Sequence, residues 1–230
     1  MHVVITGANR GIGLEFVRQY LERGNRVDAG VRHPESAREL SALAAGAGGR
    51  LRILPCDIAD DSSVKAFAEA IGNDTSVDLL VNNAGIFGSR QAFVDMDFDD
   101  LARTITTNAI GTLRVTMAFL PHLRRGSARK IVILSSKVGS IENDTSSDFY
   151  GYRMSKAALN IACKNLAIDL RSEGFTVLIV HPGWVQTAMG GPYAPTHVEE
   201  SVAGMIAQID RRGPADSGTF FDFAGNAIPW

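Results

Sequence analysis

The chain has 230 residues, of which 45% are hydrophobic and 21% charged, so it can build a core and is not expected to be disordered. Its 23 basic and 25 acidic residues nearly cancel, which gives no global attraction to nucleic acid or acidic lipid. Glycine is in excess, at 23 residues against an average of about 7%. At about 100–200 residues per domain, we expect one domain spanning residues 1–230.

The start of the chain and its cysteines favour a cytoplasmic protein. The apolar run that opens the chain stops at Gly7 and lacks the basic start and the length of a secretory signal. No stretch approaches the ~18 apolar residues of a membrane span. Cys56 and Cys163 belong to no CxxC pair, which favours buried reduced thiols. The five histidines lack the spacing of a zinc motif, so we expect no metal.

Short apolar runs rich in β-branched residues alternate with longer segments of helical period. Strands are predicted at residues 3–5, 26–31, 51–55, 78–82, 130–134, 176–180 and 219–223. Helices are predicted at residues 11–23, 35–45, 63–71, 99–118, 155–171 and 198–209. This alternation indicates parallel βαβ units with right-handed crossovers. The prediction is an α/β fold, a doubly wound parallel sheet of about seven strands with helices on both faces and a ligand site beyond the carboxyl ends of the strands.

A glycine-rich segment directly follows the first predicted strand, with Gly7, Gly11 and Gly13 in the order Gly-x-x-x-Gly-x-Gly. Glycine permits a tight turn and close approach of a pyrophosphate to the backbone, and the helix start beyond it offers unpaired N–H groups. The segment lacks the Gly-Lys-Ser/Thr ending of a P-loop, which disfavours nucleotide hydrolysis. An ordinary glycine-rich turn stays the alternative. The position between a strand and a helix favours a dinucleotide site.

Further motifs follow in order along the chain: Asn82-Asn83-Ala84-Gly85, Asn108, Ser136, Tyr152 with Lys156, and Pro182-Gly183. Together with the glycine turn, this set resembles the short-chain dehydrogenases/reductases, and the resemblance covers essentially the whole chain. Residues 141–145, 150–156 and 221–230 are similar to the branch of C-factor and sniffer-type carbonyl reductases. The resemblance implies a single Rossmann-fold domain that both binds a nicotinamide dinucleotide and carries out the chemistry.

The resemblance also implies which residues bind the cofactor. The glycine turn would carry the pyrophosphate, Asp57 would contact the adenine ring, and the segment after the sixth strand would lie beside the nicotinamide. The implied cofactor-binding residues are Gly7, Asn9, Arg10, Gly11, Ile12, Gly13, Arg32, Asp57, Ile58, Asn83, Ala84, Gly85, Tyr152, Lys156, Pro182, Gly183, Val185 and Thr187.

Tyr152 and Lys156 are the expected centre of catalysis, together with Ser136 and Asn108. Residues four apart in a helix share one face, so the ammonium, together with the positive nicotinamide of an oxidised cofactor, would lower the tyrosine pKa from its usual value of about 10. The phenol could then give a proton to a carbonyl oxygen as hydride arrives. Ser136 would donate a hydrogen bond to the developing alkoxide. The resemblance implies that Asn108 keeps a water relay to Lys156.

Each of these residues has a less specific interpretation. A Tyr-x-x-x-Lys pair alone is usually a solvated helix pair, and a lone asparagine favours a helix cap. Tyr152 follows Ser136 by 16 residues, a few more than many family members show, which leaves Ser135 and Ser140 as alternatives. Tyr150 is disfavoured, because only Tyr152 has a lysine four residues later.

The choice between NAD(H) and NADP(H) depends on the residue at the end of the second strand. Asp28 lies 21 residues beyond Gly7, and a carboxylate at that distance usually signals NAD(H). Asp28 falls inside the strand predicted at 26–31, however, whereas Arg32 follows its end and suits a phosphate. With Arg10 as a second cation, we predict that NADP(H) is favoured over NAD(H). The alternatives are a solvated Arg32 and an edge-facing Asp28.

These residues predict an NADP(H)-dependent oxidoreductase that reduces a ketone, aldehyde or quinone to the alcohol, with Tyr152 as general acid. The alternative is a cofactor-binding signalling or regulatory protein of the C-factor type with incidental turnover. A Ser-His-Asp hydrolase is disfavoured, because no Gly-x-Ser-x-Gly elbow is present. Candidate residues for the substrate wall are Phe87, Trp184, Met189 and Tyr193. The resemblance also implies a homodimer or homotetramer paired through the helices at 99–118 and 155–171, with neither nucleic acid nor membrane as partner.

Overall fold

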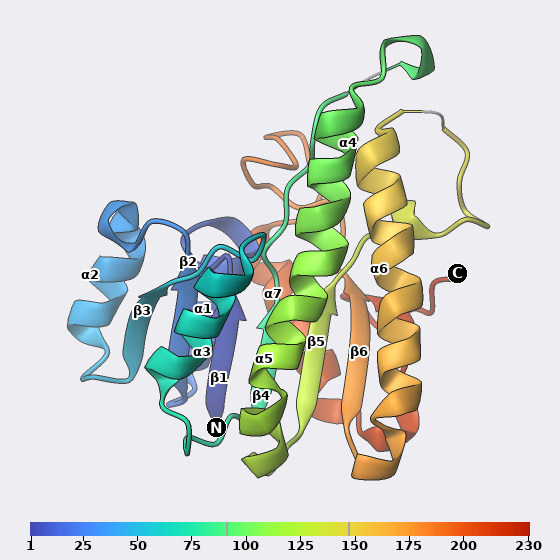
Figure 1. Cartoon of the computed structure of the whole chain (residues 1–230). Coiled ribbons are helices and arrows are strands. Elements are labelled where there is room, and N and C mark those ends of the chain that lie inside the picture. Colours follow the sequence, from blue (N-terminus) through green and yellow to red (C-terminus); the bar gives the residue numbers. More distant parts are fainter. Residues whose placement is uncertain (91, 147) are drawn as a thin grey trace.

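Seven parallel strands form one sheet in the order β3-β2-β1-β4-β5-β6-β7 in the computed structural model, which describes residues 1–90, 92–146 and 148–230 (Figure 1). The strands are β1 (His2–Thr6), β2 (Arg26–Val31), β3 (Leu51–Pro55), β4 (Leu79–Asn82), β5 (Lys130–Leu134), β6 (Thr176–His181) and β7 (Thr219–Asp222). The doubly wound parallel fold is confirmed, and every predicted strand is present. The strand order reverses between β1 and β4, and such a switch point opens a crevice for ligands.

The helices that connect the strands are α1 (Gly11–Glu22), α2 (Arg38–Gly46), α3 (Asp61–Ile71), α4 (Phe98–Ile105), α5 (Gly111–Arg125), α6 (Tyr150–Asp169) and α7 (Val198–Arg211). Short 3₁₀ turns are η1 (Pro34–Ser36), η2 (Phe93–Asp95), η4 (Lys137–Gly139), η5 (Arg171–Glu173) and η6 (Pro214–Asp216), and η3 (Thr106–Ile110) is a π turn. The helices predicted near 99–118 are α4 and α5, which η3 joins, and Figure 1 shows them as one long green rod beside α6. The helix predicted at 155–171 begins earlier, at Tyr150, which places Tyr152 in its first turn.

Apolar side chains cover both faces of the sheet. One face carries α1, α2 and α7, with Phe16 and Met205 among its buried residues. The other carries α3, α5 and α6, where the rings of Phe67 and Phe119 lie 5.1 Å apart between centroids. Burying one such side chain contributes about 1.5–3 kcal/mol. Because both faces are covered, the interiors of β5 and β6 are continuously apolar rather than alternating.

Asp28 lies inside β2 and is fully buried between β1 and β3. His2 Nε2 lies 2.6 Å from Asp28 Oδ2, and the Arg52 guanidinium donates to both carboxylate oxygens at 2.6 Å. Burial by itself would raise the pKa of Asp28, but the hydrogen bonds and charges of His2 and Arg52 hold that pKa below its usual value. The alternative of an edge-facing Asp28 is therefore wrong, because β2 is an interior strand.

Among the described residues, no helix is both long and apolar enough to span a membrane. Those residues also hold no group of three or more histidine, cysteine or acidic side chains placed to bind a metal ion. Cys56 and Cys163 are buried and free of a disulfide, and burial raises the pKa of each thiol to about 12. The prediction that both cysteines are buried is confirmed.

Candidate active site

A cavity of about 790 Å³ lies beyond the carboxyl ends of the strands. Its wall includes residues that directly follow six strands: Gly7, Arg32, Cys56, Asn83, Ser135 and Pro182. The predicted cofactor residues that line it are Gly7, Asn9, Arg10, Gly11, Ile12, Arg32, Asp57, Ile58, Asn83, Ala84, Gly85, Tyr152, Lys156, Pro182 and Thr187. Motifs that are far apart in the sequence therefore meet in one cavity.

The glycine turn brings the chain after β1 against the chain after β4. Gly7 has φ +65, and a Cβ at this position would lie 2.8 Å from Ala84 Cα. Asn83 Nδ2 donates to Thr6 O at 2.9 Å and to Gly7 O at 3.0 Å, which fixes the turn from the β4 side. A side chain at Gly7 would collide with Ala84, so glycine is what allows these two segments to meet at the cavity wall.

Three predicted cofactor residues, Gly13, Gly183 and Val185, are not among the lining residues. A Cβ on Gly13 would collide with Gly7 O. Gly183 has φ +89, and its Cβ would lie 2.9 Å from the Phe223 ring. Val185 is buried in the loop after β6. These residues shape the backbone behind the cavity wall.

Arg10, in the glycine turn after β1, and Arg32, directly after β2, are exposed cations that both line the cavity. Arg32 directly follows β2, whereas Asp28 lies three residues inside the strand and is bound by His2 and Arg52. The strand-end position therefore belongs to a guanidinium, which suits a phosphate group, and the carboxylate is already neutralised elsewhere.

Tyr152 and Lys156 lie one turn apart on α6, and both line the cavity. Lys156 is buried, so the pair is not a solvated one; its Nζ lies 5.6 Å from the centroid of the Tyr152 ring and donates to Leu134 O at 2.7 Å. Burial lowers the pKa of Lys156 to about 8. Burial raises the pKa of Tyr152 to about 12, against a smaller lowering by its hydrogen bond with Ser136. For the protein groups alone, desolvation of the phenolate outweighs its favourable contacts. The predicted lowering also counted the positive charge of an oxidised nicotinamide, and it stays a prediction for the cofactor-bound protein.

The three candidate serines have different partners. Ser136 Oγ accepts from Val138 N at 3.4 Å as the cap of η4, and hydrogen bonding by the Ser136 side chain lowers the pKa of Tyr152. Ser135 contributes to the cavity wall, but its hydroxyl donates to Asn160 Oδ1 at 2.6 Å. Ser140 Oγ accepts from Asn143 N at 3.3 Å. Of the three, Ser136 is therefore the one whose side chain contacts the tyrosine, although it is not among the lining residues.

Asn108 lies in the π turn η3 and is buried outside the cavity lining. Its Oδ1 accepts from Ile86 N and its Nδ2 donates to Ile86 O, both at 2.8 Å. Nδ2 also donates to Ser155 Oγ at 2.9 Å. Its side chain thus joins the loop after β4 to α6 beside Lys156, and a cap or turn residue alone would not make these contacts.

Sequence reasoning missed part of the lining. Arg103 and Thr107 line the cavity from α4 and η3, and their four-residue spacing on a predicted helix was a usable signal. The cavity is also lined by Ala59, Ile86, Gly88, Ser89, Leu134 and Ala188. Of the candidate wall residues, Phe87 and Met189 line the cavity. Trp184 and Tyr193 do not: Trp184 Nε1 donates to Gly190 O at 2.7 Å, and Tyr193 is 90% exposed.

Comparison with known proteins agrees with this arrangement. Residues 1–197 match the family model described as short chain dehydrogenase. The chain belongs to this family. It is 51% identical to C-signal of Myxococcus xanthus over 154 residues, which cover 67% of this chain and 93% of that protein.

Two solved carbonyl reductases share the fold over all of this chain. The NADPH-bound enzyme from chicken fatty liver is 35% identical, with a TM-score of 0.94 and 98% of its chain covered. Carbonyl reductase Sniffer of D. melanogaster is 30% identical, with a TM-score of 0.93 and 99% of its chain covered.

Proposed function

We propose that this protein reduces a ketone, aldehyde or quinone to the alcohol with NADPH. The observation that carries the proposal is the placement of a half-buried tyrosine, next to the buried Lys156, in one cavity with the glycine turn and two arginines. The likeness to an NADPH-bound carbonyl reductase and to Sniffer supports it. When bound, NADPH supplies the hydride that the carbonyl carbon receives.

In the proposed reaction Tyr152 donates the proton. With a pKa raised to about 12, its hydroxyl keeps the proton at neutral pH and can release it to the more basic alkoxide that develops on the substrate. Ser136, which already bonds the tyrosine, would orient the substrate oxygen and donate to it. Lys156 would hold the ribose of the cofactor and place its charge near the phenolate that remains. Asn108 would fix the helix that carries both side chains, and its part in a water relay stays a prediction.

The same cavity would hold the cofactor along its length. We assign the pyrophosphate to the glycine turn, the adenine to Asp57 and Ile58, and the nicotinamide end to the residues after β4 and β6. Arg10 and Arg32 would bind the 2′-phosphate, which is the reason to expect NADP(H) over NAD(H).

A screen of aldehydes, ketones and quinones with both cofactors tests the proposal. The expected result is oxidation of NADPH that depends on a carbonyl compound, is slower with NADH, and is lost in Tyr152→Phe. Full activity in Tyr152→Phe would contradict the proposed role of the tyrosine.

A second candidate is a cofactor-binding signalling protein with incidental turnover, favoured by the 51% identity to C-signal. Tight binding of NADPH without turnover of any compound in the screen would favour this candidate. The intact set of Ser136, Tyr152 and Lys156 in the cavity region argues for the enzyme.

We also propose, from the family resemblance, a homodimer or homotetramer in the cytoplasm. Exposed apolar side chains such as Leu113 and Met117 on α5 and Ile161 on α6 support an interface on these helices. Light scattering on the purified protein measures the assembly directly.

A further inference from the structure

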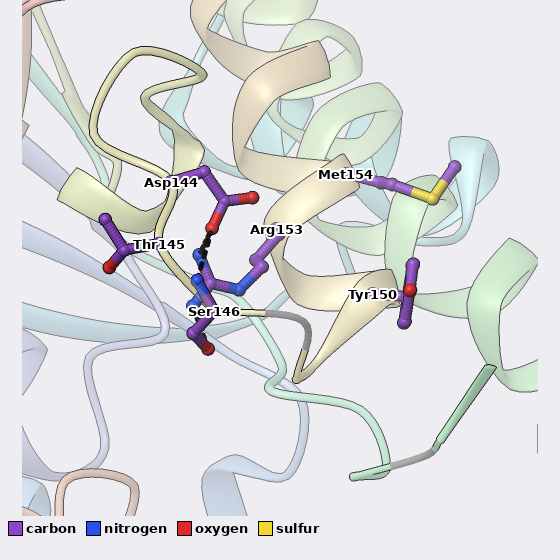
Figure 2. Close-up of a pocket in the computed structure, with 6 residues that line it drawn as sticks. All are labelled: Asp144, Thr145, Ser146, Tyr150, Arg153 and Met154. Atoms are coloured by element: carbon purple, nitrogen blue, oxygen red, sulfur yellow. Dashed lines mark hydrogen bonds and ion pairs between the residues drawn. The ribbon is translucent and has the colours of Figure 1, made fainter.

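Arg153 extends from the first turn of α6 toward the loop that precedes the helix (Figure 2). Its Nε donates to Asp148 O at 2.7 Å, one terminal nitrogen donates to Asp144 Oδ1 at 2.6 Å, and the other donates to Ser146 Oγ at 3.0 Å. The side chain is only 18% exposed, so its ion pair is screened less than one in open solvent. The planar guanidinium, with five donors in a fixed geometry, is suited to joining several acceptors at once.

The backbone at Phe149 needs this support. Phe149 has φ 62 and ψ 46, in the left-handed region that bulky side chains rarely adopt. Arg153 Nε binds Asp148 O, which belongs to the peptide that enters Phe149. Arg153 N donates at 3.0 Å to Phe149 O, which belongs to the peptide that leaves it. Both peptide planes that define this conformation are therefore bound to one residue.

The left-handed turn places the Phe149 ring against the cavity wall. Its centroid lies 4.7 Å from that of Phe87 in an edge-on contact, and the Phe87 ring lies 4.7 Å from the Tyr152 ring. Arg90 lies over the Phe149 ring at 5.5 Å and donates to Asp148 Oδ2 at 2.7 Å. Phe87 lines the cavity, so a supported aromatic surface stands directly beside the tyrosine.

We propose that Arg153 is a positioning residue that favours flat aromatic carbonyl substrates, because it holds Phe149 against Phe87 beside Tyr152. This inference rests on the proposed carbonyl reduction. Aromatic rings contact one another favourably at centroid distances of about 4.5–7 Å, so an aryl group bound next to the tyrosine meets Phe87 as its partner. A small aliphatic carbonyl has no ring to place there and gains little from this surface.

Kinetics of Arg153→Met on two aldehydes test the inference, with 4-nitrobenzaldehyde as the aryl probe and butanal as the aliphatic one. We expect KM for 4-nitrobenzaldehyde to rise about tenfold with a smaller change in kcat, since loss of one apolar contact surface has an effect of that order. The KM for butanal and the dissociation constant of NADPH should not change. Arg153→Lys can make only some of the three side-chain hydrogen bonds of Arg153. Its KM for 4-nitrobenzaldehyde should therefore lie between the values of the wild type and of Arg153→Met.

Arg124→Met is the matched control. Arg124 makes two hydrogen bonds of 2.7 Å to Glu173, near the end of α5 that lies away from the cavity, so its loss removes a comparable ion pair. It should leave every kinetic parameter at the wild-type value. Phe149→Gly removes the aromatic ring but keeps the backbone conformation, because glycine adopts the left-handed turn freely. It therefore distinguishes the effect of the ring from that of the backbone. We expect it to reproduce the aryl-specific loss without lowering Tm.

A binding measurement completes the test. In the Tyr152→Phe background, calorimetry should show weaker binding of 4-nitrobenzaldehyde when Arg153→Met is added. Equal losses for both aldehydes, or unchanged KM values in an active protein, would overturn the role of Arg153. A wild-type protein that reduces neither probe nor any other carbonyl contradicts the proposed function instead, and calorimetry then still decides whether Arg153 favours aryl binding.

Discussion

Two clusters of polar side chains, each built around a buried ionisable group, differ in how the charge of that group is compensated. The first, here called the aspartate cluster, consists of His2, Asp28 and Arg52 near the amino ends of β1, β2 and β3. The second, the tyrosine cluster, consists of Ser136, Tyr152 and Lys156 at the cavity beyond the strand ends.

The aspartate cluster compensates its charge. Asp28 Oδ1 and Oδ2 receive 2.6 Å contacts from His2 and Arg52, and the pKa of Asp28 is held below its usual value in spite of burial. In the tyrosine cluster Lys156 donates to a neutral carbonyl, and burial lowers its pKa to about 8. A buried charge that keeps a shifted pKa in a cavity is typical of a functional site, whereas a paired one is typical of structure.

The largest expected effect is on catalysis by Tyr152→Phe. Removing the proton donor should lower kcat for carbonyl reduction by about 10²–10⁴-fold, the usual contribution of a positioned general acid. The dissociation constant of NADPH and the unfolding free energy should stay at the wild-type values. Steady-state kinetics, calorimetry and urea unfolding measure the three quantities.

Next in size is the effect of Asp28→Asn on stability. Breaking a buried ion pair while one partner stays buried should lower the unfolding free energy by about 3–5 kcal/mol. The kcat of the folded fraction should not change. Because the pKa of Asp28 is lowered on folding, its contribution is present at neutral pH and disappears as the pH falls below about 4.

Asp210→Asn is the control for this stability measurement. Asp210 also pairs with an arginine at 2.6 Å, but both side chains are about two-fifths exposed. Its loss should lower the unfolding free energy by less than about 1 kcal/mol. Equal effects of the two substitutions would contradict the structural importance of the aspartate cluster.

Lys156→Met should move stability in the opposite direction. The lowering of the lysine pKa from 10.5 to about 8 corresponds to about 3 kcal/mol of unfavourable charge burial, and the lost bond to Leu134 offsets about 1 kcal/mol of it. We therefore expect a gain of about 1–3 kcal/mol in unfolding free energy at pH 7, together with loss of activity.

The pH dependence of that gain follows from proton binding. Between pH about 8 and 10.5 the unfolded chain binds the Lys156 proton more strongly than the folded protein does, so the unfolding free energy rises with pH. The difference between wild type and Lys156→Met should therefore shrink across this window. A variant that is less stable than wild type at every pH would contradict the account.

Arg32→Ala should have the smallest of these effects. Loss of one charged hydrogen bond to the 2′-phosphate should raise KM for NADPH about tenfold and leave KM for NADH unchanged. Arg26→Ala, at the other end of the same strand, is the matched control. If Arg32→Ala kept the wild-type preference for NADPH over NADH, the 2′-phosphate would be bound by another cation.

Much of this arrangement could be predicted from the sequence, because its determinants are local. Continuous apolar runs such as residues 131–134 indicate strands buried on both faces, and Gly7 stands where a strand meets a helix. The predicted bounds of β2 also placed Asp28 inside the strand and Arg32 just beyond its end, and only Arg32 lines the cavity.

The remainder depends on contacts between distant segments. The rise in the Tyr152 pKa comes from burial by several elements, which no spacing in the sequence reveals. The π turn that carries Asn108 interrupts a segment of uniform helical pattern. The hydrogen bonds of Arg153 to Asp148 and Asp144 depend on the path of the loop before α6, which has no periodic pattern in the sequence.

The most direct test of the central claim is to measure unfolding free energy and NADPH-dependent carbonyl reduction in parallel for Tyr152→Phe and Asp28→Asn. The account predicts that Tyr152→Phe loses reduction and keeps its stability, while Asp28→Asn loses stability and keeps the kcat of its folded fraction. Full reduction in Tyr152→Phe, or a loss of kcat in folded Asp28→Asn equal to that of Tyr152→Phe, would contradict it.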